Sequence, residues 1–581
     1  MSEKRTGAQI MCEALIRNGV DVMFGIPGGA IMPFYHAMWE YRDQLRHVLC
    51  RHEQGAGHAA EGYARSTGRI GVCIGTSGPG TTNLVTPIAD AMMDSTPILA
   101  ITGQVSSTVL GKDAFQETDI TGITMPIVKH NYLIKNVDEL AETFAEGIYI
   151  ATTGRPGPVL IDVTKDAMQA TTIPNWNFSL NLPGYKPNYQ GNRKQVREAI
   201  RMISAAEKPL LMVGNGVTLS GAFSELREFA ERMRLPIVTT LHGIGAFPED
   251  HPLNIGMPGM HGWVHVNRAI QECDVLINIG GRFDDRVTGK VSTFAPHAKI
   301  IHIDIDPSEI GKNVKVAVPI VGDAKMVLRD LLAELPAADG LAALHGHASD
   351  WMEHIREMQA AHQHKQQYVN RKETATMALP PHDVYAELTR ILNARGEYRV
   401  VSDVGQHQMW TAQLIDWIRP RTHITSGGAG TMGFSVPAAL GVAIAHPTDT
   451  VWVICGDGGF QMMNQEMATI IQEDIRNIKI CVINNGYLGM VRQWQELFEG
   501  KRYSGTPLTG PNFSKLAEAY GWKGIVVERS EDVTAAIEEA YATDGPVLID
   551  FRVEREVNVY PMVPQNRSIG EMLTENPEVQ A

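Results

Sequence analysis

Two polar turns in the last third of the chain have the residue types and the spacing of a metal and phosphate site. The run VWVICGDGGF predicts a buried strand that ends near Asp457, and KICVINNG predicts another that ends at Asn485. These residues lie 28 positions apart, about one strand–helix–strand crossover, which brings both strand ends to the ligand-binding edge of a parallel sheet. Their oxygens suit Mg²⁺, the glycines permit close backbone approach, and a helix N-terminus favours phosphate. Two ordinary turns are the alternative, because Asp-Gly and Asn-Gly are frequent in turns.

A lone carboxylate in the first third, Glu53, lies where the strand expected in RHVLCRHE runs into a helix. An acid at a helix N-terminus complements the helix dipole, so a structural role alone could explain it. A glycine-rich turn, SGPGTTN, follows another expected strand. Residues 428–433 also satisfy G-x-G-x-x-G, with Asp449 21 positions after the first glycine. Because Asp449 falls in the turn HPTDT and not at a strand end, the pattern disfavours a nicotinamide dehydrogenase.

These turns need strands and helices to position them. Apolar strand-like runs alternate with helical patterns nearly throughout, which predicts an α/β protein with doubly wound parallel sheets. The blocks show no sequence repeat, yet they are compatible with one fold used three times. The expected strands lie at 20–26, 46–53, 70–77, 96–103, 157–164, 209–216, 235–241, 273–281, 299–306, 318–323, 398–405, 451–458, 479–486 and 545–553.

Breaks in this alternation predict the domain boundaries. The stretch 171–191 is rich in Pro, Asn and Gly without periodicity, and 336–380 is polar with one helical segment at 351–368. We therefore predict an N-terminal domain, a linker, a central domain, a second linker, a C-terminal domain and a tail. Their respective ranges are 1–170, 171–191, 192–335, 336–380, 381–560 and 561–581.

Composition restricts the class of protein. The 581 residues correspond to roughly three to four domains. A net charge of −14 disfavours nucleic acid and anionic membrane surfaces as partners. No apolar run approaches the ~20 residues of a membrane-spanning helix. The six cysteines form no C-x-x-C pair, and the N-terminal sequence has no signal or transit pattern. These features predict buried reduced thiols in a cytoplasmic protein, and no disulfide framework or zinc site.

Several motifs carry a family resemblance. GDG followed after one crossover by NN resembles the diphosphate and metal motif of thiamine-diphosphate enzymes, and RHEQGAGHAAEGYAR resembles their glutamate helix. Narrower motifs are similar to those of acetohydroxyacid (acetolactate) synthase catalytic subunits, and the matches cover nearly the whole chain. They include DAFQETD, RFDDRVTGK, GTMGF, NNGYLGMVRQWQELF and NVYPMVP. Gly459, where many relatives have Ser, and a crossover one residue longer are departures that bear on the metal geometry.

The resemblance implies thiamine diphosphate between the first domain of one subunit and the third domain of another, in a homodimer or homotetramer. Glu53 would hydrogen-bond the aminopyrimidine ring, and Met432 would hold the cofactor bent. Mg²⁺ would be bound by Asp457, Asn485 and the main-chain oxygen of Tyr487. The implied thiamine-diphosphate contacts are Glu53, Gln406, His407, Gly430, Met432, Asp457, Gly458, Gly459, Asn485, Tyr487, Leu488, Gly489 and Met490.

The resemblance also implies FAD in the central domain, although the implied reaction needs no flavin redox chemistry. Glycines and acids at strand ends fit a dinucleotide lying across a sheet edge, and they fit plain turns equally well. The implied FAD contacts are Arg155, Gly214, Asn215, Gly216, Thr240, Leu241, His261, Gly280, Arg282, Asp304 and Asp323.

The implied reaction decarboxylates pyruvate and joins the hydroxyethyl unit to a second 2-oxoacid, pyruvate or 2-oxobutyrate, at the start of valine, leucine and isoleucine synthesis. Gln116 and Lys165 would be catalytic residues at the mouth of the site, and Phe115 would contact substrate. Arg286 would grip the second carboxylate, although it could instead pair with a neighbouring aspartate on the surface. Trp494 would cover the extra methyl group of 2-oxobutyrate.

Other functions remain open at this point. A thiamine- and FAD-dependent pyruvate oxidase would use the flavin, and a simple decarboxylase would release acetaldehyde. Another thiamine carboligase would share the GDG and NN motifs. A non-catalytic flavin- or nucleotide-binding subunit is the alternative that is not an enzyme, and Glu53 argues against it. The family resemblance is also compatible with a small regulatory subunit as partner.

Overall fold

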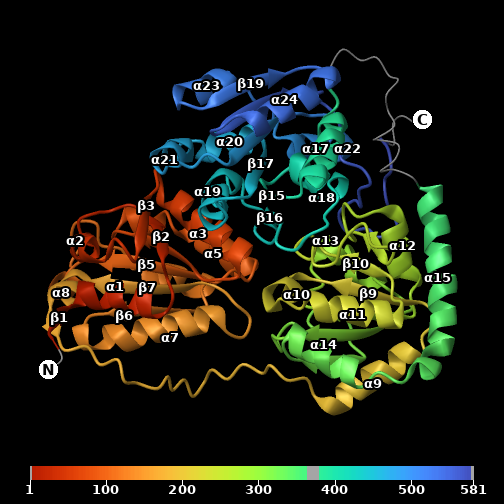
Figure 1. Ribbon diagram of the computed structural model, residues 1–581, viewed down its shortest axis with the longest axis horizontal. Helices are drawn as coiled ribbons and strands as arrows, with labels where there is room; N and C mark the ends of the chain where they lie inside the picture. Colours follow the sequence, from red (N-terminus) through yellow and green to blue (C-terminus); the bar gives the residue numbers. More distant parts are fainter. Residues whose placement is uncertain (1–2, 363–378, 577–581) are drawn as a thin grey trace.

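Three lobes, each built on a six-stranded parallel sheet flanked by helices, make up the computed structural model, which describes residues 3–362 and 379–576 (Figure 1). In the N-terminal sheet the strand order is β3-β2-β4-β5-β7-β6. Its strands are β2 (Val22–Gly25), β3 (Arg46–Leu49), β4 (Gly71–Gly75), β5 (Ile98–Gln104), β6 (His130–Ile134) and β7 (Val159–Thr164). The main helices are α1 (Gly7–Arg17), α2 (Met32–Tyr41), α3 (Glu53–Thr67), α4 (Pro79–Thr82), α5 (Val85–Met93), α6 (Ile120–Thr124), α7 (Leu140–Thr152) and α8 (Lys165–Gln169).

The C-terminal sheet repeats this topology, with the order β16-β15-β17-β18-β20-β19. Its strands are β15 (Tyr398–Ser402), β16 (His423–Thr425), β17 (Thr450–Gly456), β18 (Ile478–Asn484), β19 (Lys523–Val527) and β20 (Val547–Arg552). The helices are α17 (Pro381–Arg395), α18 (Gln406–Leu414), α19 (Ser435–Ala445), α20 (Asp457–Met463), α21 (Glu466–Gln472), α22 (Gly489–Phe498), α23 (Phe513–Ala519) and α24 (Ser530–Ala542).

The central sheet has a different order, β11-β10-β9-β12-β13-β14. In chain order this is 3-2-1-4-5-6, the arrangement of dinucleotide-binding sheets, so one topology occurs twice and a second lies between them. The strands are β9 (Pro209–Val213), β10 (Ile237–Thr239), β11 (Asn254–Gly256), β12 (Val275–Ile279), β13 (Lys299–Asp304) and β14 (Val318–Val321). The helices are α9 (Arg193–Ser204), α10 (Asn215–Ser220), α11 (Phe223–Met233), α12 (Val264–Glu272), α13 (Asp285–Thr288), α14 (Ala324–Ala333) and α15 (Ala342–Ala361).

The α/β class is confirmed, and all fourteen expected strands are present. The sequence did not reveal β6, β11, β16 and β19, which all lie at sheet edges. It also missed the small antiparallel ribbon of β1 (Arg5–Thr6) and β8 (Thr171–Thr172). The helix expected at 351–368 begins earlier, as α15, and its expected end lies outside the described residues. Trp351 and Ile355 of α15 are buried in a core shared with the central and C-terminal domains.

The N- and C-terminal domains pack through two helices that cross without room for side chains. A Cβ on Gly62 of α3 would lie 2.0 Å from the main-chain oxygen of Ala438 in α19. A Cβ on Gly441 of α19 would lie 1.9 Å from the main-chain oxygen of Ala59 in α3. Both obstacles are backbone atoms, so the two glycines set the distance between the domains.

We expect Gly441→Ala to lower the thermal unfolding midpoint, because overpacking a closed contact costs about 1–3 kcal/mol. Gly346→Ala is the matched control. Gly346 lies on an exposed turn of α15, and no atom of residues 3–362 or 379–576 lies within 4 Å of an added Cβ. There the change should raise the midpoint, since Ala is favoured over Gly in helices by about 1 kcal/mol. Calorimetry of both variants tests whether their midpoints shift in opposite directions from the wild-type value. A Gly441→Ala midpoint equal to that of the wild type would show that the helix crossing can adjust to the added methyl group.

Candidate functional site

A pocket opens at the carboxyl edge of the C-terminal sheet, where β15, β17 and β18 end. It therefore lies at the switch point of this sheet, between β15 and β17. Eleven of the thirteen residues implied for thiamine diphosphate line it: Gln406, His407, Met432, Asp457, Gly458, Gly459, Asn485, Tyr487, Leu488, Gly489 and Met490. Gly430 is outside the lining, in the loop that leads to Met432, where its φ of +68° requires a left-handed backbone.

Asp457 has the properties of a metal ligand. It is the first residue of α20, only 3% exposed, and its Oδ1 is buried without a hydrogen-bond partner among the described residues. Burial raises the pKa of this carboxyl group to about 7, against opposing hydrogen bonds from backbone N–H groups. A cation would compensate the charge that burial disfavours. The donor set of Asp457 and Asn485 therefore fits Mg²⁺.

A hydrogen-bonded network fixes the opposite wall of this pocket. Asn485 donates from Nδ2 to Gln406 Oε1 at 3.2 Å and accepts from the Tyr487 backbone N–H at 3.1 Å. Gln406 in turn donates to Gln493 Oε1 at 2.9 Å. The His407 ring packs against Gly405 and Gly456, where an added Cβ would lie 2.9 and 3.0 Å from its Cε1. Small and amide residues thus leave the pocket open and rigid.

Glu53 begins α3 at the carboxyl edge of the N-terminal sheet. It is 9% exposed, and its Oε2 accepts a hydrogen bond from Asn83 Nδ2 at 2.9 Å. Within the described residues, the pocket around Asp457 is lined by 404–491 alone, so Glu53 does not reach it in its own chain. The chain carries both halves of the implied site without joining them.

The implied substrate residues lie apart from that pocket. Phe115 is 87% exposed, and Gln116 beside it has a φ of +60° and lies against Gly78 of the glycine-rich turn. Lys165 begins α8. Arg286 is largely exposed in α13, with its Nε 3.9 Å from Asp285 Oδ2. The half-buried Trp494 of α22 packs edge-on against Phe498.

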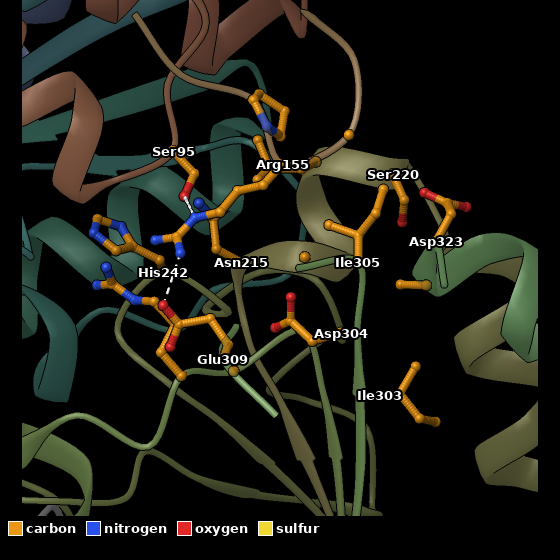
Figure 2. A pocket seen from close by; sticks show the side chains of 18 of the residues that line it. Ser95, Arg155, Asn215, Ser220, His242, Ile303, Asp304, Ile305, Glu309 and Asp323 are labelled. Carbon is orange, nitrogen blue, oxygen red and sulfur yellow. Dashed lines mark hydrogen bonds and ion pairs between the residues drawn. The ribbon is translucent and has the colours of Figure 1, made fainter. Parts of the chain in front are cut away.

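A larger pocket lies at the carboxyl edge of the central sheet, at the switch point between β9 and β12 (Figure 2). Gly216 and Gly280, which follow these strands, approach so closely that a Cβ on Gly216 would lie 2.6 Å from the Gly280 Cα. Eight of the eleven residues implied for FAD line it: Arg155, Asn215, Gly216, Thr240, Gly280, Arg282, Asp304 and Asp323. The two arginines and the strand-end acids suit the diphosphate and ribose groups of a dinucleotide, so the pocket fits FAD.

Two of the remaining three residues adjoin this pocket. Gly214 caps α10 next to Asn215, and Leu241 follows Thr240. His261 instead lies buried beside the C-terminal segment, with Nδ1 3.3 Å from the main-chain oxygen of Pro561.

Sequence reasoning missed several charged or titratable residues of the central pocket, among them Glu309, Asp94 and His242. Glu309 binds Arg155 at 2.8 Å, as Figure 2 shows, and Arg155 also donates to Ser95 Oγ at 2.9 Å. Asp94 and His242 lie on the same wall, 3.0 Å apart. Only Asp94 and Ser95 could have been recognised from the sequence, because they form a polar turn at the end of an amphipathic helix.

All six cysteines are buried. Among the described residues, no helix combines the length and apolar character needed to cross a membrane.

Three family models match the chain in sequence order. They are the N-terminal thiamine-pyrophosphate-binding domain of thiamine pyrophosphate enzymes at residues 5–123, the central domain at 196–331, and the C-terminal thiamine-pyrophosphate-binding domain at 403–551. The central model covers its whole sheet, and the other two cover most of theirs, with β6, β7 and β15 outside the matched ranges.

Curated relatives are similar over nearly the full length. The acetolactate synthase large subunit of Mycobacterium tuberculosis is 50% identical, covering 100% of this chain and 92% of its own. That of Corynebacterium glutamicum is 50% identical over 97% and 90% of the two chains, respectively. A probable acetolactate synthase large subunit of Methanocaldococcus jannaschii is 47% identical over 96% and 93%. Similarity of this extent, added to the paired sheets and the pocket at Asp457, shows that the chain belongs to the acetolactate synthase family of thiamine-diphosphate-dependent enzymes.

Proposed function

We propose that this protein is an acetolactate synthase, which decarboxylates pyruvate and joins the two-carbon unit to a second 2-oxoacid, pyruvate or 2-oxobutyrate. The observation that carries this proposal is the buried Asp457 oxygen, which has no hydrogen-bond partner in the part of the chain that the structure describes and lies in a pocket at the switch point of the C-terminal sheet. Each six-stranded sheet falls inside one of the domains proposed from the sequence, 1–170, 192–335 and 381–560. Formation of acetolactate from pyruvate, with thiamine diphosphate, Mg²⁺ and FAD added, tests the proposal directly.

The residues of the C-terminal pocket would hold the cofactor. Asp457, Asn485 and the main-chain oxygen of Tyr487 would bind Mg²⁺, and the N-terminus of α20 with Gly458 would face the diphosphate. Met432, on the pocket wall, would shape the cofactor. When bound, thiamine diphosphate supplies the electron sink that decarboxylation of a 2-oxoacid requires.

Glu53 would act from the partner subunit. Its carboxylate, fixed by Asn83, would hold a proton at the aminopyrimidine ring. Because the pocket in this chain is lined, among the described residues, by 404–491 alone, we propose a homodimer, or a homotetramer built from two such dimers. Each site would pair the N-terminal domain of one subunit with the C-terminal domain of another. Phe115, Gln116 and Lys165 would lie at the mouth of that shared site.

FAD would occupy the central pocket. Arg155 and Arg282 would neutralise its diphosphate, and the strand-end carboxylates of Asp304 and Asp323 would face its hydroxyl groups. Joining two pyruvates with loss of carbon dioxide involves no net oxidation, so this role is in binding and not in electron transfer.

Glu53→Gln should leave the fold intact and reduce acetolactate formation by roughly 100- to 10,000-fold, the usual range for general acid–base catalysis. Glutamine keeps the size and the hydrogen bond to Asn83 but cannot hold the proton. Steady-state kinetics with saturating cofactor measures the loss. Near wild-type turnover would remove Glu53 from the mechanism.

Mixing two inactive variants provides the control for a shared site. In a heterodimer of Glu53→Gln and Asp457→Ala chains, one site carries both changes and the other carries neither. Activity should therefore return when the unfolded variants are mixed and refolded together. If each site lay within one chain, the mixture would stay inactive.

Asp457→Ala should weaken the binding of both thiamine diphosphate and Mg²⁺. The Asp457 carboxylate would be a ligand of the metal ion, and the diphosphate of the cofactor would supply further ligands of the same ion. Isothermal calorimetry at limiting Mg²⁺ measures both affinities. FAD affinity, followed by flavin fluorescence, should not change and reports that the chain is folded. An unaltered affinity for thiamine diphosphate would exclude Asp457 as the ligand.

Trp494→Leu should reduce the preference for 2-oxobutyrate over pyruvate by about fourfold, the value of one buried methylene group. Arg286→Ala should instead impair both products, since both acceptors present the same carboxylate. A competition assay with both 2-oxoacids gives the product ratio. Equal loss of both products with an unchanged ratio in Trp494→Leu would mean that the ring is structural.

A further inference from the structure

The segment 93–95, at the C-terminal end of α5, forms a wall between the central pocket and the C-terminal domain. On one side it accepts hydrogen bonds from three residues that line the pocket. Arg282 donates to the main-chain oxygen of Met93, and Asn215 to that of residue 94 at 3.1 Å. Arg155 donates to the hydroxyl of residue 95 at 2.9 Å (Figure 2). The pocket wall is thus supplied by the N-terminal domain.

The carboxylate of Asp94 makes contacts with all three domains. Its Oδ1 accepts from the Gly428 backbone N–H at 2.7 Å and lies 3.0 Å from His242 Nε2 in the central pocket. Its Oδ2 accepts from the Gly427 backbone N–H at 3.0 Å and pairs with Arg65 of α3 at 2.5 Å. The side chain is fully buried. Each oxygen therefore has two partners from the protein.

The charge of this carboxylate is maintained by its surroundings. Burial alone would raise the pKa of Asp94, but His242 and Arg65 beside it hold that pKa well below its usual range. An ionised carboxylate accepts shorter and stronger hydrogen bonds than a neutral one. The two glycine N–H groups therefore donate to an ionised carboxylate.

These contacts fix the loop 427–433. A Cβ on Gly428 would lie 2.7 Å from Asp94 Oδ1, so no other residue fits there without displacing the carboxylate. At its far end the loop is held by Gly433, whose N–H donates to Asp403 Oδ1 at 3.0 Å. Met432, which lines the proposed thiamine-diphosphate pocket, lies between the two attachments.

We propose that Asp94 is a positioning residue that couples the flavin pocket to the thiamine-diphosphate pocket. Its contacts connect the wall of the flavin pocket to the loop 427–433, which shapes the thiamine-diphosphate pocket. The inference rests on the proposed function, since it takes both cofactors as ligands. A flavin in contact with the wall at Asp94 and His242 favours the carboxylate position that the loop requires. Flavin therefore tightens thiamine-diphosphate binding, and thiamine diphosphate tightens flavin binding by the same factor.

The alternative is a buried ion cluster that only stabilises the fold. His58, Glu61 and Asp90 lie close together beside Arg65, and Ser426 Oγ donates to Asp90 Oδ1 at 2.6 Å. If Asp94 merely belonged to this cluster, its loss would lower stability without changing how one cofactor affects the other.

The experiment measures thiamine-diphosphate affinity by calorimetry at fixed Mg²⁺, with and without saturating FAD. In the wild type we expect FAD to tighten binding by roughly 5- to 150-fold, the usual range of coupling between two sites. In Asp94→Asn the factor should fall to near one, since the neutral asparagine side chain cannot replace the charged carboxylate in its contacts with Arg65 and His242. A wild-type factor of one, or an unchanged factor in Asp94→Asn, overturns the proposal.

Two further variants keep the proposal testable if Asp94→Asn does not fold. Gly428→Ala adds a methyl group on the loop that disturbs the contact between Gly428 and the Asp94 carboxylate. This variant should also abolish coupling. Hydrogen exchange of peptides covering 427–433 should slow on adding FAD in the wild type and not in Gly428→Ala. Slowing in both would overturn the proposal.

Ser95→Ala is the matched control, because it removes the bond to Arg155 from the same segment and leaves the carboxylate in place. This variant should weaken flavin binding and preserve the coupling factor. Loss of coupling in Ser95→Ala would show that the coupling depends on the whole segment 93–95, and this would overturn the role of Asp94. Failure of the proposed function would look different, as a wild-type protein that binds neither cofactor or forms no acetolactate.

Discussion

The crossing of α3 and α19 determines where the functional groups of two domains lie. Gly62 and Gly441 bring the two helix backbones into contact, and a side chain at either position would force the helices apart. Glu53 begins α3, Arg65 lies in its last turn, and the loop that carries Met432 leads directly into α19. The same helix pair thus fixes a proposed catalytic acid, a partner of Asp94 and the approach to the cofactor pocket. Residues with no chemical role set the precision of those that have one.

The sequence predicted the interior strands well, because strands buried on both faces appear as uninterrupted apolar runs. The edge strands β6 and β19 were missed for the same physical reason. Each is only partly buried along most of its length and begins with a polar residue, His130 or Lys523, so the apolar run that remains is short. The pocket at Asp457 and Asn485 was also predictable, because crossover spacing alone brings two strand ends together.

The contacts of Asp94 and His242 could not be predicted in this way. The two residues are 148 positions apart, and no periodicity relates them. Only the packing of three domains brings them together, with Gly427 and Gly428 from the third. His261 shows the converse, because a position carried over from the resemblance lies beside Pro561 instead of in the pocket lining. Local patterns predict elements and strand ends, whereas contacts between domains depend on orientations that no short motif encodes.

The Asp457 oxygen that lacks a hydrogen-bond partner among the described residues affects the stability of the protein, and through it the amount of protein in the cell. A chain without cofactor keeps a carboxylate in a place that disfavours its charge, so the ligands that relieve this cost also stabilise the fold. A ligand at 100 times its dissociation constant adds about 2.7 kcal/mol to the free energy of unfolding. Cofactor supply would therefore set the abundance of the protein as well as its activity, since unfolded chains are removed by proteases. Cells short of thiamine would lose the polypeptide itself, and recovery would require new translation.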